Sequence, residues 1–416
     1  MSPTIETNRL PKEATPQKAK KLYLELLRYL AIFLVIYNHT AGNGFLLFID
    51  NTEPKWLYPI HLFVSQIDKI AVPLFFMISG ALLLGKEEPF CVLLKRRVLK
   101  NLLVLLGISA FYLFYNDISL QQNLTHSNLL SDPSLTDPTL KDILARNSAL
   151  KDVVLTDPDL TNPTAKDVTF LGFFALVYNQ ELSPQLWFLY AYIGAMLMLP
   201  FLRKIAKLLT YRESLYLLVG NLLFLGMIPI ALYFINGQYI DSIGHFSIPM
   251  FTLRPIFYML MGYFLEHIMP KEKYTCRNAI IAVALFFAFG AMDAYVTHLL
   301  ILDLQEAGSA DAFSYNLFSC LVAVPAMGVF FLVKYLFIKV HIPNILEKII
   351  IACGSSVFGI YLLEAVLRRE TYAIFLSLAN ILPKGVACSI WVLVCMFIGT
   401  VVTLLLKKIP GVRNLL

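Results

Sequence analysis

Long runs of apolar residues recur along the whole chain and set the strongest limit on its fold. About ten runs approach or exceed the roughly 20 residues that cross a bilayer as a helix. Only 15% of the 416 residues are charged, whereas soluble domains carry about a quarter. The sequence therefore predicts an all-α polytopic integral membrane protein, a bundle of about ten transmembrane helices. The candidate spans are 22–40, 57–84, 98–116, 184–202, 214–235, 250–267, 278–300, 316–338, 350–367 and 385–406.

Lysine and arginine residues gather in alternate loops, and this asymmetry predicts the orientation of the spans. The stretches "NGQYIDSIGHFS" and "DLQEAGSADAFS" contain neither residue and are expected to lie outside. We expect a multi-pass protein of the cell (plasma or inner) membrane, with tails 1–21 and 409–416 both cytoplasmic. The same distribution accounts for the net charge of +6, so no nucleic-acid partner is expected. The expected inner clusters lie within 12–21, 95–100, 203–212, 271–277, 334–348 and 407–413.

A polar insert, 117–168, separates the two parts of the membrane domain, 22–116 and 169–408. An apolar residue recurs in it at every fifth position, which is typical of a stacked repeat and resembles the pentapeptide-repeat solenoid. The alternative is an extended extracytoplasmic loop, and we assign the insert no chemistry. The adjoining segment 169–178 is too short to cross a bilayer and is expected at its surface. The repeated positions are Leu130, Leu135, Leu140, Ala145, Leu150, Leu155, Leu160, Ala165 and Phe170.

Two ionisable residues interrupt the first span, "ELLRYLAIFLVIYNHT". Arg28 and His39 are eleven positions apart, which on a helix places them within about 20° of one azimuth and roughly 16 Å apart along the axis. An arginine at mid-span costs about 2.5–3.5 kcal/mol on insertion scales, so such residues face the bundle interior. The alternative is that Arg28 pairs with Glu25, one turn earlier, while His39 lies at the membrane surface.

Further motifs follow in a fixed order along the chain. The second span contains Asp68 and Lys69 and then "VPLFFMISG", with "KRR" after it. "LWFLY", "MGY" and "GIYLLE" occur in the fourth, sixth and ninth spans. Together with the Arg28–His39 spacing, these motifs resemble the acyltransferase-3 family of membrane O-acyltransferases. The resemblance covers about residues 22–406, apart from the insert.

The resemblance implies an enzyme that takes an acyl group, commonly acetyl, from a cytoplasmic donor such as acetyl-CoA. The acceptor would be a hydroxyl of a surface glycan or glycolipid outside the membrane. Arg28 and His39 match the essential pair of the family. Their chemistry agrees with this role, because a sugar hydroxyl needs a general base at neutral pH and histidine has a suitable pKa.

The basic cluster after the second span is a candidate site for the donor. Arg96 and Arg97 can hold phosphate groups, although the alternative is that they only set the topology. No bound cofactor is expected, since acyl-CoA is a substrate. No metal site is expected either, because the six cysteines form no C-x-x-C pair.

The remaining candidates are assigned to substrate binding. Many relatives carry histidines where this chain has Gln185 and Glu364, which leaves the acceptor preference or the proton relay open. The leading alternative function is a transporter or flippase of a lipid-linked or acylated saccharide, with Asp68, Lys69, Arg28 and Arg254 along its path. The substrate-binding candidates are Asp68, Lys69, Ser79, Arg96, Arg97, Trp187, Arg254, Tyr361 and Glu364.

Overall fold

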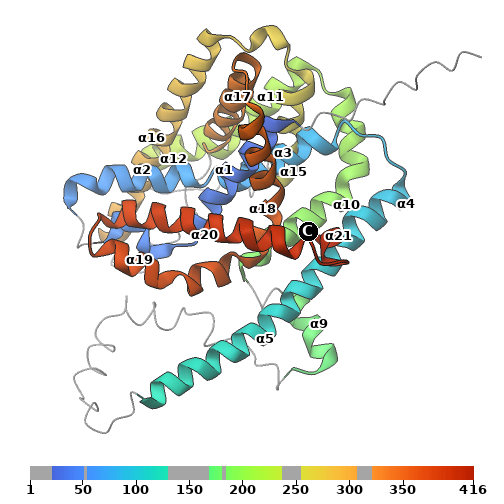
Figure 1. Cartoon of the computed structure of the whole chain (residues 1–416). Coiled ribbons are helices and arrows are strands. Elements are labelled where there is room, and N and C mark those ends of the chain that lie inside the picture. Colours follow the sequence, from blue (N-terminus) through green and yellow to red (C-terminus); the bar gives the residue numbers. More distant parts are fainter. Residues whose placement is uncertain (1–20, 51–53, 130–167, 180–183, 237–253, 307–320) are drawn as a thin grey trace, which may run out of the picture.

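A computed structural model describes residues 21–50, 54–129, 168–179, 184–236, 254–306 and 321–416. These residues form helices, and no strand occurs among them (Figure 1).

The first half contains α1 (Leu22–Asn38), α2 (Tyr58–Asp68), α3 (Ala71–Leu83), α4 (Phe90–Leu93), η4 (Leu94–Leu99), α5 (Lys100–Leu129), α9 (Phe170–Tyr178) and α10 (Trp187–Leu208). The second half contains α11 (Tyr211–Asn221), η7 (Leu222–Met227), α12 (Ile228–Asn236), α15 (Arg254–Tyr263), η8 (Phe264–Ile268), α16 (Cys276–Glu306), α17 (Ala323–Lys339), α18 (Asn344–Glu370), α19 (Tyr372–Ala379), α20 (Lys384–Leu406) and α21 (Val412–Leu415).

Within the described ranges, seven helices are long and apolar enough to cross a membrane, which makes the chain a multi-pass membrane protein. The other three predicted spans coincide with shorter helical stretches: α1 and α17, of 17 residues each, and α15 with η8. A helix of 17 residues is about 26 Å long, slightly less than the roughly 30 Å hydrocarbon core. The count of about ten spans therefore stays a prediction.

Helix α1 lies at the centre of the bundle and packs against α3, α17, α18 and α20 (Figure 1). Its side chains Leu27, Ala31, Ile32 and Ile36 are fully buried. A helix that is apolar on all sides is stable only when other helices surround it. The sequence thus directs its first span into the interior, where Arg28 and His39 meet protein instead of lipid.

The second predicted span, 57–84, is broken in its middle. Helix α2 ends at Asp68, a turn covers Lys69 and Ile70, and α3 begins at Ala71. Pro73 accounts for the break, because proline has no N–H to bond the carbonyl four residues earlier and its ring clashes with that carbonyl. The carbonyl in question belongs to Lys69. The break therefore falls at the two charged residues of this span.

Helices α3 and α15 cross at very short range through a reciprocal pair of glycines. A Cβ atom on Gly80 would lie 1.9 Å from the carbonyl oxygen of Met259, and one on Gly262 would lie 1.9 Å from that of Met77. Small residues permit this kind of backbone approach between membrane helices. The crossing holds α3 and α15 together beside the cavity described below.

Replacing Gly80 by alanine is expected to lower the free energy of unfolding by about 1–3 kcal/mol or more, because the added methyl meets backbone instead of a flexible side chain. The thermal midpoint of the purified protein in detergent measures this loss. Gly107→Ala on α5 is the matched control, since a Cβ there has nothing within 4 Å. Equal midpoints for the two variants would contradict the close crossing.

The polar insert falls mostly outside the described residues, which omit 130–167. Helix α5 continues beyond the predicted end of the third span, at 116, to Leu129. The pentad repeat itself stays a prediction. The segment predicted to lie at the membrane surface forms α9, a helix of nine residues, with Phe170, Leu171 and Tyr178 largely exposed.

Candidate active site

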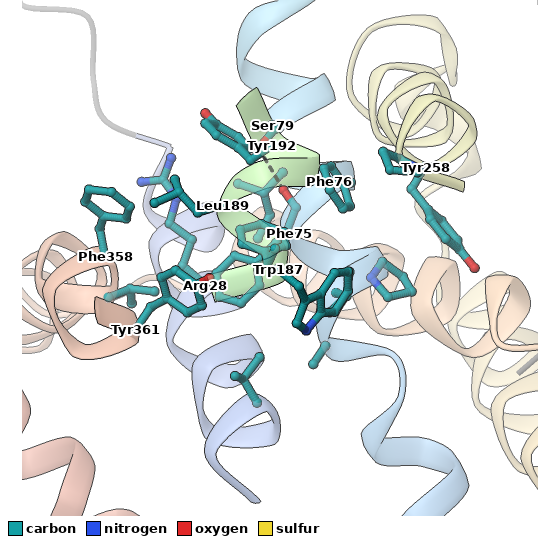
Figure 2. A pocket seen from close by; sticks show the side chains of 18 of the residues that line it. Arg28, Phe75, Phe76, Ser79, Trp187, Leu189, Tyr192, Tyr258, Phe358 and Tyr361 are labelled. Carbon is teal, nitrogen blue, oxygen red and sulfur yellow. Dashed lines mark hydrogen bonds between the residues drawn. The ribbon is translucent and has the colours of Figure 1, made fainter. Parts of the chain in front are cut away.

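One cavity of about 740 Å³ lies between α1, α3, η4, α10, α15 and α18. All the site residues predicted from the sequence line it, except Glu364, which lies behind His39. Figure 2 shows Arg28 from α1 among aromatic residues of α3, α10 and α18. The predicted residues that line the cavity are Arg28, His39, Asp68, Lys69, Ser79, Arg96, Arg97, Trp187, Arg254 and Tyr361.

At one end of the cavity, His39 forms a hydrogen-bonded pair with Glu364. The Nδ1 atom of His39 lies 2.9 Å from Oε1 of Glu364, whose side chain is fully buried. Arg368 donates from Nε to the other carboxylate oxygen at 2.8 Å and from Nη1 to the carbonyl oxygen of His39 at 2.6 Å. One arginine therefore binds both members of the pair.

Helical spacing explains how this group is built. Tyr361, Glu364 and Arg368 are three and four residues apart on α18, so they share one face. His39 follows the last residue of α1, where a carbonyl has no partner within the helix, and its carbonyl oxygen accepts the bond from Arg368 instead. Arg368 was not among the site residues predicted from the sequence. Its position one turn after Glu364 is the signal that could have pointed to it.

The partners of His39 determine which ring nitrogen carries the proton. A carboxylate only accepts hydrogen bonds, and Arg368 keeps Glu364 in this form by a direct ion pair at 2.8 Å. The neutral His39 ring therefore donates from Nδ1, which leaves the lone pair on Nε2. Because His39 also lines the cavity, the pair is suited to remove a proton from a molecule bound there.

Farther along α1, Arg28 is bound by an acidic residue of the same helix. Its Nη1 atom lies 3.0 Å from both carboxylate oxygens of Glu25. The sequence analysis left a choice between this pair and a role in the site. The structure contains the pair, and the paired Arg28 also lines the cavity that His39 lines. The role of Arg28 in the site stays a prediction.

The π-helical turn η4 supplies basic residues to the cavity wall. Arg97 is bound to Glu88 by two hydrogen bonds of 3.0 and 2.7 Å, and Arg203 binds the same carboxylate at 2.9 Å. These two guanidinium groups, Arg97 first, lower the pKa of Glu88 to about 2 against the opposing effect of partial burial. Much of the charge of Arg97 is thus already compensated within the protein.

Arg96 and Lys100 line the same cavity without an acidic partner in the described part of the chain. They are one helical turn apart, so they form a compact pair of positive charges. Lys100 was absent from the candidates chosen from the sequence. Its distinguishing property, the lack of a counter-charge, depends on the folded structure.

The middle of the cavity is largely aromatic. Trp187 is 43% exposed, and Phe188 beside it contacts the Tyr361 ring at 5.7 Å between centroids. The hydroxyl of Tyr361 donates to the carbonyl oxygen of Gln185 at 3.1 Å. Ser79 donates its hydroxyl proton to the Phe75 carbonyl at 2.8 Å, a bond within α3.

No cluster of three or more histidine, cysteine, aspartate or glutamate side chains suited to a metal ion occurs among the residues that the structure describes. The polar groups that line the described cavity include His39, which is backed by Glu364 and Arg368, the basic residues of η4 and α5, Arg28, and Asp68 with Lys69 at the helix break.

A multi-pass helical protein with such a cavity, lined by basic residues and by a histidine that is paired with a buried carboxylate, has the architecture of a membrane enzyme. The chain belongs to the acyltransferase-3 family, because the model of that family, described as an acyltransferase domain, matches residues 21–409. The protein is accordingly an acyltransferase. No curated protein and no solved structure matches the chain.

Proposed function

We propose that the protein transfers an acyl group, in the simplest case acetyl, from a cytoplasmic donor such as acetyl-CoA to a hydroxyl of an extracytoplasmic glycan or glycolipid. The observation that carries the proposal is the contact between His39 and the buried Glu364 at the cavity wall. The test compares the O-acetyl content of surface polysaccharide from cells with and without the protein. Equal contents would overturn the proposal.

In the proposed reaction, Nε2 of His39 removes the proton of the acceptor hydroxyl as its oxygen attacks the thioester carbonyl carbon. The C–S bond then breaks and the imidazolium returns the proton to the departing thiolate. The products are the O-acyl ester and the free thiol of CoA, and His39 is neutral again. Glu364 stabilises the imidazolium between these steps, as a carboxylate does for a catalytic histidine in acyl transfer.

The basic end of the cavity supports a phosphate-bearing donor. Arg28, Arg96, Arg97 and Lys100 all line it. Because Glu25 and Glu88 already bind Arg28 and Arg97, we assign the donor phosphates to Arg96 and Lys100. The positive-inside distribution supports placing this end and both chain termini on the cytoplasmic side of the cell membrane.

Replacing Arg96 or Lys100 by glutamine is expected to weaken the affinity for acetyl-CoA roughly tenfold each, since each loses a charge-assisted contact with phosphate. Binding to membrane vesicles with an accessible cytoplasmic face measures this change. The matched control is Lys95→Gln, an exposed neighbour with the same loss of charge that does not line the cavity. Unchanged affinity in both cavity variants would remove the donor assignment.

A further inference from the structure

Asp68 is a buried carboxyl group that the mechanism above does not use. It is the last residue of α2, it lines the cavity, and it is only 1% exposed. Neither of its side-chain oxygens has a hydrogen-bond partner in the structure as described. Buried polar groups are nearly always paired, because an unpaired one loses its bonds to water without replacement.

The neighbouring cation does not fill this gap. The ammonium group of Lys69 donates to Oε1 of Gln66 at 2.9 Å. Gln66 in turn donates to Oγ1 of Thr297 on α16 at 3.0 Å. Lys69 is thus connected to α16 through two hydrogen bonds. Its ammonium group forms no hydrogen bond with Asp68.

Asp68 lies near His39, the proposed base. The side chain of Asn38, one residue before His39, lies close to Asp68, although no atom pair between them meets the distance and angle of a hydrogen bond. Asp68 and His39 therefore belong to the same end of one cavity. The break in the second span, next to Pro73, ends α2 at this carboxyl group.

We infer that Asp68 binds a second hydroxyl group of the acceptor and makes the enzyme selective for polyhydroxylated acceptors such as sugar rings. The inference rests on the proposed function. A sugar ring presents further hydroxyls near the one that reacts, and each can donate a hydrogen bond to a carboxyl oxygen. Trp187, exposed in the same cavity, offers an aromatic face to the apolar side of such a ring.

The chain provides a matched control for Asp68. Asp293 on α16 is 2% exposed, and its Oδ1 atom also lacks a described partner. It is not among the residues that line the cavity. A variant of Asp293 therefore changes a buried carboxyl group of the same kind without removing a group from the cavity wall.

The first experiment measures surface O-acetylation in cells and the thermal midpoint of the purified protein for Asp68→Asn, Asp68→Leu and Asp293→Asn. Asp68→Leu is expected to reduce O-acetylation roughly tenfold to a hundredfold, and Asp68→Asn less, because an amide oxygen still accepts. The midpoints of both Asp68 variants should equal or exceed that of the wild type, since replacing a buried carboxyl group that has no hydrogen-bond partner rarely costs stability. Asp293→Asn should retain O-acetylation within about twofold.

The second experiment supplies purified protein in vesicles with acetyl-CoA and either glycerol or propan-1-ol at equal concentration. The wild type is expected to acetylate glycerol about tenfold faster, and Asp68→Leu should remove this preference. Equal rates in the wild type, or no transfer to either alcohol, would overturn the inference. Normal O-acetylation by Asp68→Leu would also overturn it. The same holds if Asp68→Leu loses both thermal stability and acyl transfer, or if Asp293→Asn loses as much O-acetylation as Asp68→Leu. A wild type that adds no O-acetyl groups in cells would instead overturn the proposed function.

Discussion

His39→Ala is expected to reduce acyl transfer by about 10²–10⁴-fold, the usual contribution of a positioned general base. The O-acetyl content of surface polysaccharide measures the effect in cells, and release of CoA from acetyl-CoA measures it in vesicles. The fold should persist, because the His39 side chain is 24% exposed and lies at the end of α1, outside its fully buried stretch.

The control for this variant is His341→Ala, which changes an exposed histidine outside the cavity. It should transfer acyl groups at the wild-type rate. Unaltered O-acylation in His39→Ala cells, combined with altered export of saccharide, would favour the transporter alternative. Unaltered O-acylation with unaltered export would remove the base assignment alone.

Glu364→Gln is expected to lower kcat by a similar factor, about 10²–10⁴-fold, because the amide offers an N–H to His39 and selects the wrong tautomer, as in serine proteases whose triad aspartate becomes asparagine. The KM values for donor and acceptor should change little, since Glu364 does not line the cavity. Steady-state kinetics in vesicles separate these constants. A large rise in KM with unchanged kcat would show that Glu364 binds substrate instead.

Arg368→Lys tests the third member of the His39–Glu364–Arg368 group. Lysine keeps the positive charge near Glu364 but cannot bind both that carboxylate and the His39 carbonyl in the geometry of the guanidinium group. We expect kcat to fall by about tenfold, with KM nearly unchanged. Arg369→Lys is the matched control, because the neighbouring Arg369 guanidinium group lies over the Tyr115 ring, whereas the bonds to Glu364 and to the His39 carbonyl come from Arg368. Equal kcat values for the two variants would contradict the positioning role of Arg368.

Much of the site could be predicted because helical periodicity is a local property. The eleven-residue spacing placed Arg28 and His39 on one face, and both do line one cavity. Charged or polar residues within apolar runs were natural candidates for the interior, because lipid disfavours them. The same reasoning selected Asp68, Lys69 and Arg254, which line this cavity as well.

The pairing of these groups could not be predicted in the same way. Arg97 and Arg96 are adjacent in the sequence, yet Arg97 is bound to Glu88 while Arg96 has no acidic partner within the described residues. Glu364 was predicted to bind substrate, which stays a prediction; the structure places its carboxylate behind His39, outside the residues that line the cavity. Such differences depend on which carboxylates other helices and loops bring within about 3 Å.

The sequence by itself determined the helical membrane class, the approximate places of seven spans and the common face of Arg28 and His39. Each of these follows from composition and from the 3.6-residue period, which act over one helix. The tertiary structure alone decided that Arg368 binds both His39 and Glu364, that Lys100 joins Arg96, and that the Asp68 oxygens have no hydrogen-bond partner among the described residues. These outcomes depend on how α1, α2, α5 and α18 pack together, because hydrogen bonds and ion pairs form only where two side chains actually meet.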